Sequence, residues 1–334
     1  MSNIYKTLPV FLFVFAFNCG KNRPLQIAGE TMGTTYQITI INHSNNEIDA
    51  IHLQEKVDSL LNDVNNIFST YIKTSELTRF NDNMSTMPTK ISTKFSELYQ
   101  KAVSISLSSD GSFDFTVLSL VKLWGFGPGF NNSKIPSKDQ INEIMHYTGI
   151  ENVEFSDGYL SKLDKHVQID FSAIAKGWGV DQVALFLNDQ GFNNYMVEIG
   201  GEIRVSGFNN FNSEWSLGIS SPEDSETGLY TTITVSDLAV ATSGSYNNYF
   251  TLENTNYSHI INPKTGYPIK HDLVSATIVA KDCATADAIA TAVMVKGFNL
   301  GLEWINSLPD IECLLVKVDD SGNYITGKSS GFNY

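Results

Sequence analysis

The stretch of residues 166–181 constrains the fold more than any other part of the chain. Its sequence, HVQIDFSAIAKGWGVD, opens with a β-type run over Val167–Phe171. Ser172 is a favourable N-cap, and Ile174–Leu187 then carries apolar residues at helical spacing. The pattern predicts a strand that runs directly into a helix.

The side chains at this junction indicate either a binding site or a tight packing turn. Asp170 and Lys176 flank the turn, while Gly177 and Gly179 keep the first helical turns slim. Backbone N–H groups at a helix start lack helical partners and can hold an anion. An acidic residue is an unusual neighbour for an anion, unless it contacts another part of the ligand or a metal lies between them. The alternative is an ordinary strand–helix turn in which small residues allow close contact.

The other segments mix strand and helix patterns without regular alternation. A clear amphipathic helix is expected over Leu53–Phe68, where six apolar residues share one face. Further helices are expected over 75–80, 92–107, 136–149 and 285–296. Strands are expected over 30–41, 153–160, 162–171, 195–199, 202–207, 215–219, 230–235, 238–242, 248–252 and 274–280, and around Leu314 and Tyr324. Strands outnumber helices, so we predict an α+β fold with mixed or antiparallel sheets and packed helices, in one domain over residues 28–334.

The charge balance argues against nucleic acid as a partner. The chain has 22 Lys and Arg residues against 36 Asp and Glu residues, a formal net charge of −14. Nucleic-acid phosphates are bound by clusters of Lys and Arg, which this composition disfavours. Any phosphate ligand would therefore need a cation beside it.

Residues 1–18 have the pattern of an export signal. Lys6 supplies a positive start, and Leu8–Phe17 is an apolar run too short to span a bilayer. Cys19 follows at once, an arrangement that resembles a bacterial lipoprotein signal, in which this cysteine becomes the lipidated N-terminus. Asn18 stands where a small residue is usual, so ordinary secretion is the alternative.

An exported chain of this type would be lipid-anchored on the periplasmic side of a bacterial membrane, with residues 19–27 as a tether. The two remaining cysteines, Cys283 and Cys313, have no CxxC or Cys/His spacing. They support neither a zinc site nor a disulfide framework, and a single bridge between them stays open.

Eight motifs, in order along the chain, resemble the ApbE-like family of FAD:protein FMN transferases, formerly described as thiamine-biosynthesis lipoproteins. No single motif is specific, but together they span nearly the whole mature chain. They are Met32–Tyr36, Ser69–Tyr71, Gly111–Asp114 with Leu123–Phe126, Asp170–Asp181, Glu198–Gly201, Ala241–Gly244, His259–Gly266 and Ala286–Gly297. The chain departs from the family pattern at Asn262, where Asp before Pro is usual, although Asn forms similar turns.

The resemblance implies Mg²⁺-dependent transfer of the FMN part of FAD to a Ser or Thr hydroxyl of an extracytoplasmic acceptor, with release of AMP. The acceptor would be a redox-pump or electron-transfer subunit. The family's flavin contacts correspond to Met32, Tyr71, Ser112, Phe113, Asp114, Asp170, Lys176 and Ile260. Its Mg²⁺ ligands correspond to the Ala173 carbonyl, the Asp287 carboxylate and the Thr291 hydroxyl.

The residue types agree with this chemistry. Asp287 and Thr291 are four apart on a predicted helix, so their oxygens share one face. Mg²⁺ prefers oxygen ligands and keeps places open for phosphates. The alternative is that Thr291 bonds back to the carbonyl of Asp287 within the helix. His259 and Asp287 are the candidate bases, although a histidine before a Pro/Gly turn is more often structural.

Two other functions use the same site. Water as acceptor would make the protein an FAD pyrophosphatase that yields FMN and AMP. A non-enzymatic exported FAD carrier would need no metal at the scissile bond, so the pair of Asp287 and Thr291 argues against it. A solute-binding lipoprotein is disfavoured because the chain lacks two similar α/β lobes.

Overall fold

An eight-stranded sheet forms the centre of the molecule. The computed structural model describes residues 24–42, 49–127, 135–222, 228–245, 249–252 and 255–334. The strand order is β1-β2-β6-β7-β10-β13-β14-β15, and each pair of neighbours is antiparallel. The strands are β1 (Leu25–Thr31), β2 (Thr34–Ile40), β6 (Tyr195–Ile199), β7 (Glu202–Ser206), β10 (Ala239–Gly244), β13 (Leu273–Ala280), β14 (Glu312–Val318) and β15 (Tyr324–Lys328). The predicted α+β class is confirmed.

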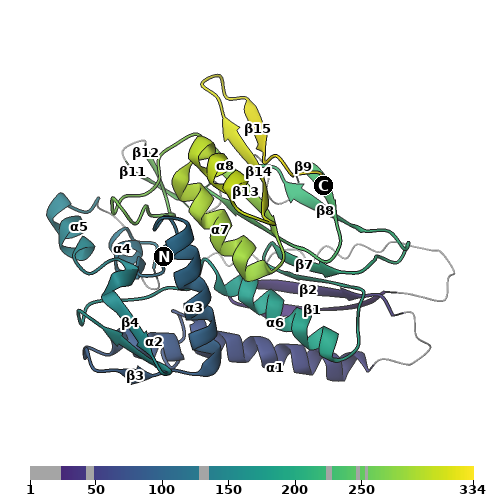
Figure 1. Ribbon diagram of the computed structural model, residues 1–334, viewed down its shortest axis with the longest axis horizontal. Coiled ribbons are helices and arrows are strands. Elements are labelled where there is room, and N and C mark those ends of the chain that lie inside the picture. Colours follow the sequence, from purple (N-terminus) through teal and green to yellow (C-terminus); the bar gives the residue numbers. More distant parts are fainter. Residues whose placement is uncertain (1–23, 43–48, 128–134, 223–227, 246–248, 253–254) are drawn as a thin grey trace, which may run out of the picture.

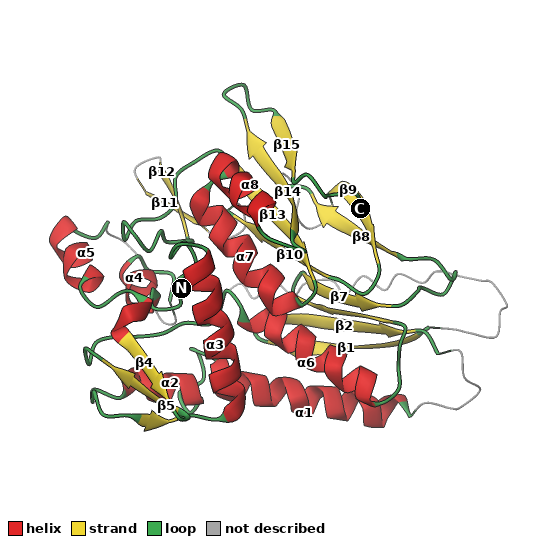
Figure 2. Cartoon of the chain, viewed as in Figure 1, coloured by secondary structure: helices red, strands yellow, loops and turns green. Residues whose placement is uncertain are grey.

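Helices cover one face of this sheet, and a hairpin packs on the other (Figures 1 and 2). The helices are α1 (Ala50–Phe68), α6 (Ala175–Asp189), α7 (Cys283–Lys296) and α8 (Phe298–Ser307). The hairpin is β8 (Trp215–Ser220) with β9 (Leu229–Val235). Helix α7 is buried on most of its surface, because its many alanines let neighbouring elements approach closely.

A smaller part of the molecule packs beside α1 and α7 and contributes the other side of the site. It contains α2 (Glu76–Asp82), α3 (Thr93–Ser108), α4 (Leu118–Leu123), α5 (Lys138–Met145), the 3₁₀ turn η1 (Ile150–Asn152), the three-stranded sheet of β3 (Thr89–Lys90), β5 (Tyr159–Lys162) and β4 (Val153–Ser156), and the hairpin of β11 (Tyr249–Leu252) and β12 (Thr255–Ser258). The rings of Phe68, Phe95, Phe115 and Phe171 join this part to the main core, with centroids 5.5–5.9 Å apart.

The predicted strand Val167–Phe171 is an extended segment outside every described sheet. The Ile169 N–H donates to Asn81 Oδ1, and Asn81 Nδ2 donates to the Ile169 carbonyl, both at 2.8 Å. The Asp170 N–H donates to the Phe115 carbonyl at 2.6 Å. A buried amide side chain therefore satisfies backbone groups that a neighbouring strand would otherwise pair.

The helix after this segment begins differently from the prediction. Helix α6 starts at Ala175, and its N-cap, Ile174, makes no side-chain bond. The predicted N-cap, Ser172, instead donates its N–H to Asp170 Oδ1 at 2.8 Å, so the carboxylate organises the turn.

The prediction that glycines allow close packing against the first turns of α6 is confirmed. A Cβ atom at Gly177 would lie 2.3 Å from the Cys283 carbonyl oxygen, and one at Gly179 would lie 2.7 Å from the Met32 methyl group.

The predicted strand over 30–41 is a hairpin of β1 and β2. Met32 and Gly33 form its turn with φ of 51° and 75°, as a two-residue type I′ hairpin requires. Because β1 begins at Leu25, the end of the predicted tether over 19–27 belongs to the sheet. The predicted signal and Cys19 lie outside the described residues. Helices α4 and α8 and strands β3 and β12 were not predicted.

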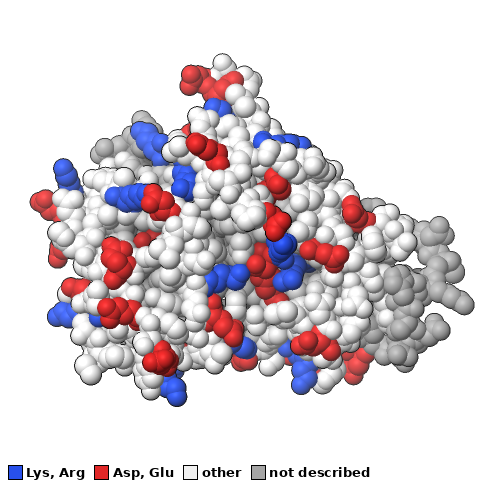
Figure 3. Space-filling model, in the orientation of Figure 1, with Lys and Arg blue, Asp and Glu red and all other residues white. Residues whose placement is uncertain are grey.

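Cys283 and Cys313 are both buried free thiols, so no bridge joins them. On the face shown in Figure 3, basic and acidic side chains are interspersed. None of the helices in the described ranges combines the length and the apolarity needed to cross a membrane.

Candidate active site

Two adjoining cavities of about 430 and 740 Å³ lie beside the start of α6. Thr70, Tyr71, Asp170, Ser172 and Lys176 line both of them. Cavities of this size accommodate small-molecule ligands and cofactors.

Every predicted site residue lines this pair of cavities, although the role given to each stays a prediction. Met32 lines the larger cavity, while Tyr71, Asp170 and Lys176 stand where the two meet. The smaller cavity is lined by Ser112, Phe113, Asp114, Ala173, His259, Ile260, Asp287 and Thr291. The Tyr71 side chain is 72% exposed, so its ring is available to stack on a ligand.

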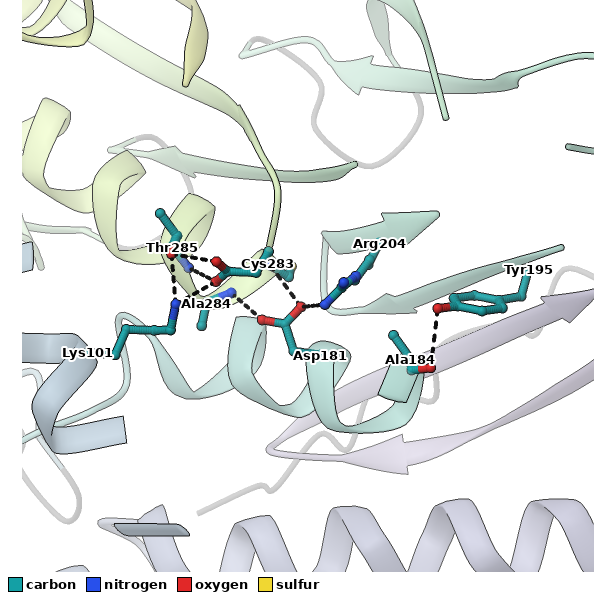
Figure 4. A network of polar contacts seen from close by, with 9 residues as sticks. Lys101, Asp181, Ala184, Tyr195, Arg204, Cys283, Ala284 and Thr285 are labelled. Atoms are coloured by element: carbon teal, nitrogen blue, oxygen red, sulfur yellow. Dashed lines mark hydrogen bonds and ion pairs between the residues drawn. The ribbon is translucent and has the colours of Figure 1, made fainter. Parts of the chain in front are cut away.

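A buried carboxylate fixes the helices that carry the site (Figure 4). Asp181 of α6 accepts from the N–H groups of Cys283 and Ala284 at 2.9 Å each, and from Arg204 Nη1 at 2.6 Å. The first turn of α7 is thereby held against α6 and β7. Asp287 and Thr291 follow on α7, so their positions depend on this contact.

Lys101 of α3 reinforces the same helix start. Its Nζ lies 3.0 Å from Asp282 Oδ1, the N-cap of α7, and 3.0 Å from Thr285 Oγ1 (Figure 4). The beginning of α7 is therefore bonded directly to α3 and α6, and through Asp181 it is linked to β7.

A cluster of three charged side chains forms one wall of the smaller cavity. Lys176 Nζ lies 3.0 Å from Glu202 Oε1 and 3.9 Å from Asp287 Oδ1. Asp287 Oδ2 accepts the Gly177 N–H at 3.0 Å. Two carboxylates face one ammonium, so the fully ionised cluster keeps an excess negative charge.

Burial and mutual charge shift all three pKa values. Burial raises the pKa of Asp287, against the opposing effects of Lys176 and the Gly177 N–H. Burial also raises the pKa of Glu202 to about 8, again against Lys176 and with help from Asp287. Burial alone would lower the pKa of Lys176, but the two carboxylates outweigh it and raise that pKa. A cluster with these shifts would be stabilised by a further cation.

The residues beside this cluster fit a hard divalent cation such as Mg²⁺. Thr291 Oγ1 lies 3.3 Å from Ser243 Oγ, and within the described chain it makes no bond back to the Asp287 carbonyl. The available donors are a carboxylate, hydroxyls and a main-chain carbonyl, which are oxygen ligands of the kind Mg²⁺ takes. Across the described ranges, no three His, Cys, Asp or Glu side chains cluster as metal ligands, so the fit rests on this mixed set.

The loop from His259 to Gly266 closes another side of the smaller cavity. The His259 ring lies edge-on to Phe126 at 6.3 Å between centroids. Asn262 Oδ1 accepts the Lys264 N–H at 2.9 Å, so this residue organises the turn. The departure from the family pattern at this position thus preserves a turn-forming side chain.

Glu202 is a site residue that sequence reasoning missed. It directly follows Gly200 and Gly201, whose φ angles are 59° and 101° and which form the turn between β6 and β7. Gly200 and Glu202 both line the smaller cavity. The usable signal was an acidic residue directly after paired glycines, at the start of a strand.

Asp114→Asn is expected to stabilise the ligand-free protein at pH 7 by about 2 kcal/mol. Asp114 Oδ1 accepts from the Thr116 N–H and Oγ1 at 2.7 and 2.6 Å, yet burial raises the pKa of Asp114 to about 6. Since this lies above the unfolded value, ionisation costs stability as the pH rises from about 4 to 6. The asparagine amide oxygen still accepts the hydrogen bonds from Thr116, and the side chain carries no charge. Urea unfolding at pH 4 and pH 7 tests this, and an equal gain at both would contradict it.

Known proteins resemble this chain over most of its length. Residues 32–315 match the ApbE family. The FAD:protein FMN transferase of Vibrio cholerae serotype O1 is 42% identical over 298 residues, which are 89% of this chain and 88% of the relative. The protein of that name from Haemophilus influenzae is 36% identical over 318 residues, 93% of this chain and 91% of the relative.

Solved structures agree with these sequence matches. The flavin transferase ApbE from Vibrio cholerae superposes with a TM-score of 0.85 at 39% identity, over 93% of this chain and 98% of the other. The apo form of the Pseudomonas stutzeri flavinyl transferase ApbE gives a TM-score of 0.87 at 30% identity, over 95% of this chain and 98% of the other.

Proposed function

Because the chain belongs to the ApbE family, it is a transferase that moves flavin from FAD to protein, and we propose how its residues do so. The acceptor is a Ser or Thr hydroxyl of an extracytoplasmic protein, a redox-pump or electron-transfer subunit. Its oxygen attacks the phosphorus on the FMN side of FAD, the bond from that phosphorus to the bridging oxygen breaks, and AMP leaves with the electron pair. The product is an FMN ester of the acceptor.

The observation that carries this proposal is the convergence of the flavin and metal positions on one pair of cavities. Residues from Met32 to Thr291, far apart in sequence, line two spaces that meet at Asp170 and Lys176. The larger, more apolar space beside Met32 and Tyr71 suits a flat ring system, while the smaller one holds the charged cluster.

The chain's own groups bind and orient FAD, and one of them accepts a proton. Lys176 attracts the diphosphate, and Tyr71 and Phe113 pack on rings of FAD. Asp287, Thr291 and the Ala173 carbonyl would hold Mg²⁺, which supplies charge neutralisation to phosphoryl transfer when bound. With Asp287 so occupied, His259 is the better base for the acceptor's hydroxyl proton.

We expect slow AMP release from FAD alone, and at least a roughly tenfold acceleration with a competent acceptor, or about 1.4 kcal/mol of barrier. A docked hydroxyl gains proximity that free water lacks. The test is incubation with FAD, Mg²⁺ and extracytoplasmic extract, followed by a denaturing gel scanned for flavin fluorescence and by mass spectrometry of Ser and Thr. Fast conversion to FMN and AMP without acceptor would favour the pyrophosphatase, and binding without turnover would favour the carrier.

We also propose that Cys19 is lipidated and anchors the protein at the periplasmic side of the membrane. The pattern of Lys6, Leu8–Phe17 and Cys19 supports this. Cys19→Ser is expected to move the protein from the membrane fraction to the soluble extracytoplasmic fraction, or to block its processing. Fractionation and the mass of the mature N-terminus measure this. Unchanged processing and location in the variant would favour simple secretion.

A further inference from the structure

Glu202 carries a buried carboxylate oxygen that the protein leaves unsatisfied. The residue is 4% exposed and lines the smaller cavity. Its Oε1 accepts from Lys176 Nζ at 3.0 Å, whereas Oε2 has no hydrogen-bond partner within the described part of the chain. A buried polar oxygen without a partner costs free energy, so such atoms are rare unless a ligand or water completes them.

The backbone around Glu202 holds this oxygen in a fixed place. Glu202 pairs with Ile199 across the β6–β7 hairpin, and the Gly201 N–H donates to Glu198 Oε1 at 2.6 Å within the turn. The Lys176 ammonium restrains the other carboxylate oxygen. The side chain therefore cannot rotate away from Lys176 without losing a buried ion pair.

The surroundings select the kind of group that Oε2 can bind. A phosphate oxygen would meet another oxygen at Oε2 with no cation between them, because the Lys176 ammonium lies against the opposite oxygen, Oε1. A neutral O–H donor satisfies the oxygen without adding charge. In a flavin transferase, such donors are the sugar hydroxyls of FAD and the hydroxyl of the acceptor.

We propose that Glu202 is a substrate-binding residue whose Oε2 accepts a hydrogen bond from a substrate hydroxyl, while its Oε1 holds Lys176 toward the diphosphate. This inference rests on the proposed function, because that function supplies both hydroxyls. It adds a recognition contact to the charged wall of the cavity.

The test compares Glu202→Gln with Glu198→Gln in the Mg²⁺-loaded protein. Both variants replace a carboxyl group by an amide in the same hairpin, but Glu198 is outside the residues that line the cavities. The measurements are the Kd for FAD by flavin fluorescence, and the rates of flavin transfer to an acceptor protein and of FAD hydrolysis without it. Thermal unfolding verifies that each variant is folded, and Glu202→Asp replaces Glu202→Gln if the latter does not fold.

If the hydroxyl belongs to FAD, Glu202→Gln raises the Kd for FAD roughly tenfold. If it belongs to the acceptor, FAD affinity and acceptor-free hydrolysis stay near the wild-type values while transfer falls roughly tenfold. Glu198→Gln behaves like the wild type in both cases. FAD affinity and transfer within twofold of wild type in Glu202→Gln would overturn the inference. If the wild-type protein binds FAD but does not transfer its flavin, the proposed function is refuted. The comparison of FAD affinities between wild type and Glu202→Gln still tests the role of Glu202 in that case.

Discussion

Asp287→Ala is expected to lower the rate of flavin transfer by roughly a thousandfold, or about 4 kcal/mol of barrier. Asp287 is the one carboxylate among the proposed Mg²⁺ ligands, and it lies 3.9 Å from Lys176 on the cavity wall. Its loss would remove a ligand of the proposed cation, which would neutralise the diphosphate. FAD binding should fall much less, because contacts in the larger cavity remain. AMP release and FAD affinity, measured with and without a chelator, separate these effects.

Asp287→Asn is the matched control for local structure. The amide oxygen can still accept the Gly177 N–H, which donates to Asp287 Oδ2 at 3.0 Å in the native protein. The contact between the helices is then kept while the charge is lost, so activity should fall nearly as far as with alanine. Full activity in either variant, or wild-type turnover that a chelator leaves unchanged, would contradict the assignment.

Gly177→Ala is expected to destabilise the fold by about 2 kcal/mol or more, and to lower activity as well. The added Cβ would meet backbone atoms of α7, at 2.3 Å from the Cys283 oxygen and 2.8 Å from the Ala284 Cα. Backbone cannot move aside as a side chain tip can, so the two helices must separate. That separation strains the Asp181 bonds to α7 and the Gly177 bond to Asp287. Urea unfolding measures the loss.

Gly179→Ala, two residues further along α6, is the control for the stability measurement. Its new Cβ would meet the Met32 methyl group, the mobile end of a flexible side chain. Alanine also favours helix over glycine by up to about 1 kcal/mol, so the stability should change little. An equal loss in both variants would show that the close approach of α6 to α7 is not the cause.

The fold was predictable where local pattern and final structure agree. The apolar spacing in residues 53–68 identified α1, because one face of that helix is buried. The extended segment before α6 was mistaken for a strand because its partner is the Asn81 side chain, 88 residues away from Ile169. A single side chain that pairs with the backbone in place of a neighbouring strand produces no periodic pattern in the sequence. Helix α8 was missed although one face of it packs on α7 and β14.

Most of the site residues could be predicted only because the sequence resembles a known family. The flavin and metal positions came from motif order, and spacing alone supported only the pairing of Asp287 with Thr291. Glu202 could not be found this way, because its importance depends on a lysine 26 positions earlier that the fold brings within 3.0 Å. The raised pKa values of Glu202 and Asp287 likewise arise from burial, which only the assembled fold creates.

The scattered origin of the cavity wall has a consequence for folding. The Gly177–Asp287 bond spans 110 residues, and the Trp124 indole N–H reaches the Gly266 carbonyl across 142. Closing such long loops costs entropy before the contacts form, and chains of high contact order fold slowly. No short fragment contains the whole wall, so the flavin site exists only once the chain has folded globally. FAD then binds the native state and not the unfolded chain, so a supply of flavin shifts the folding equilibrium toward the finished enzyme.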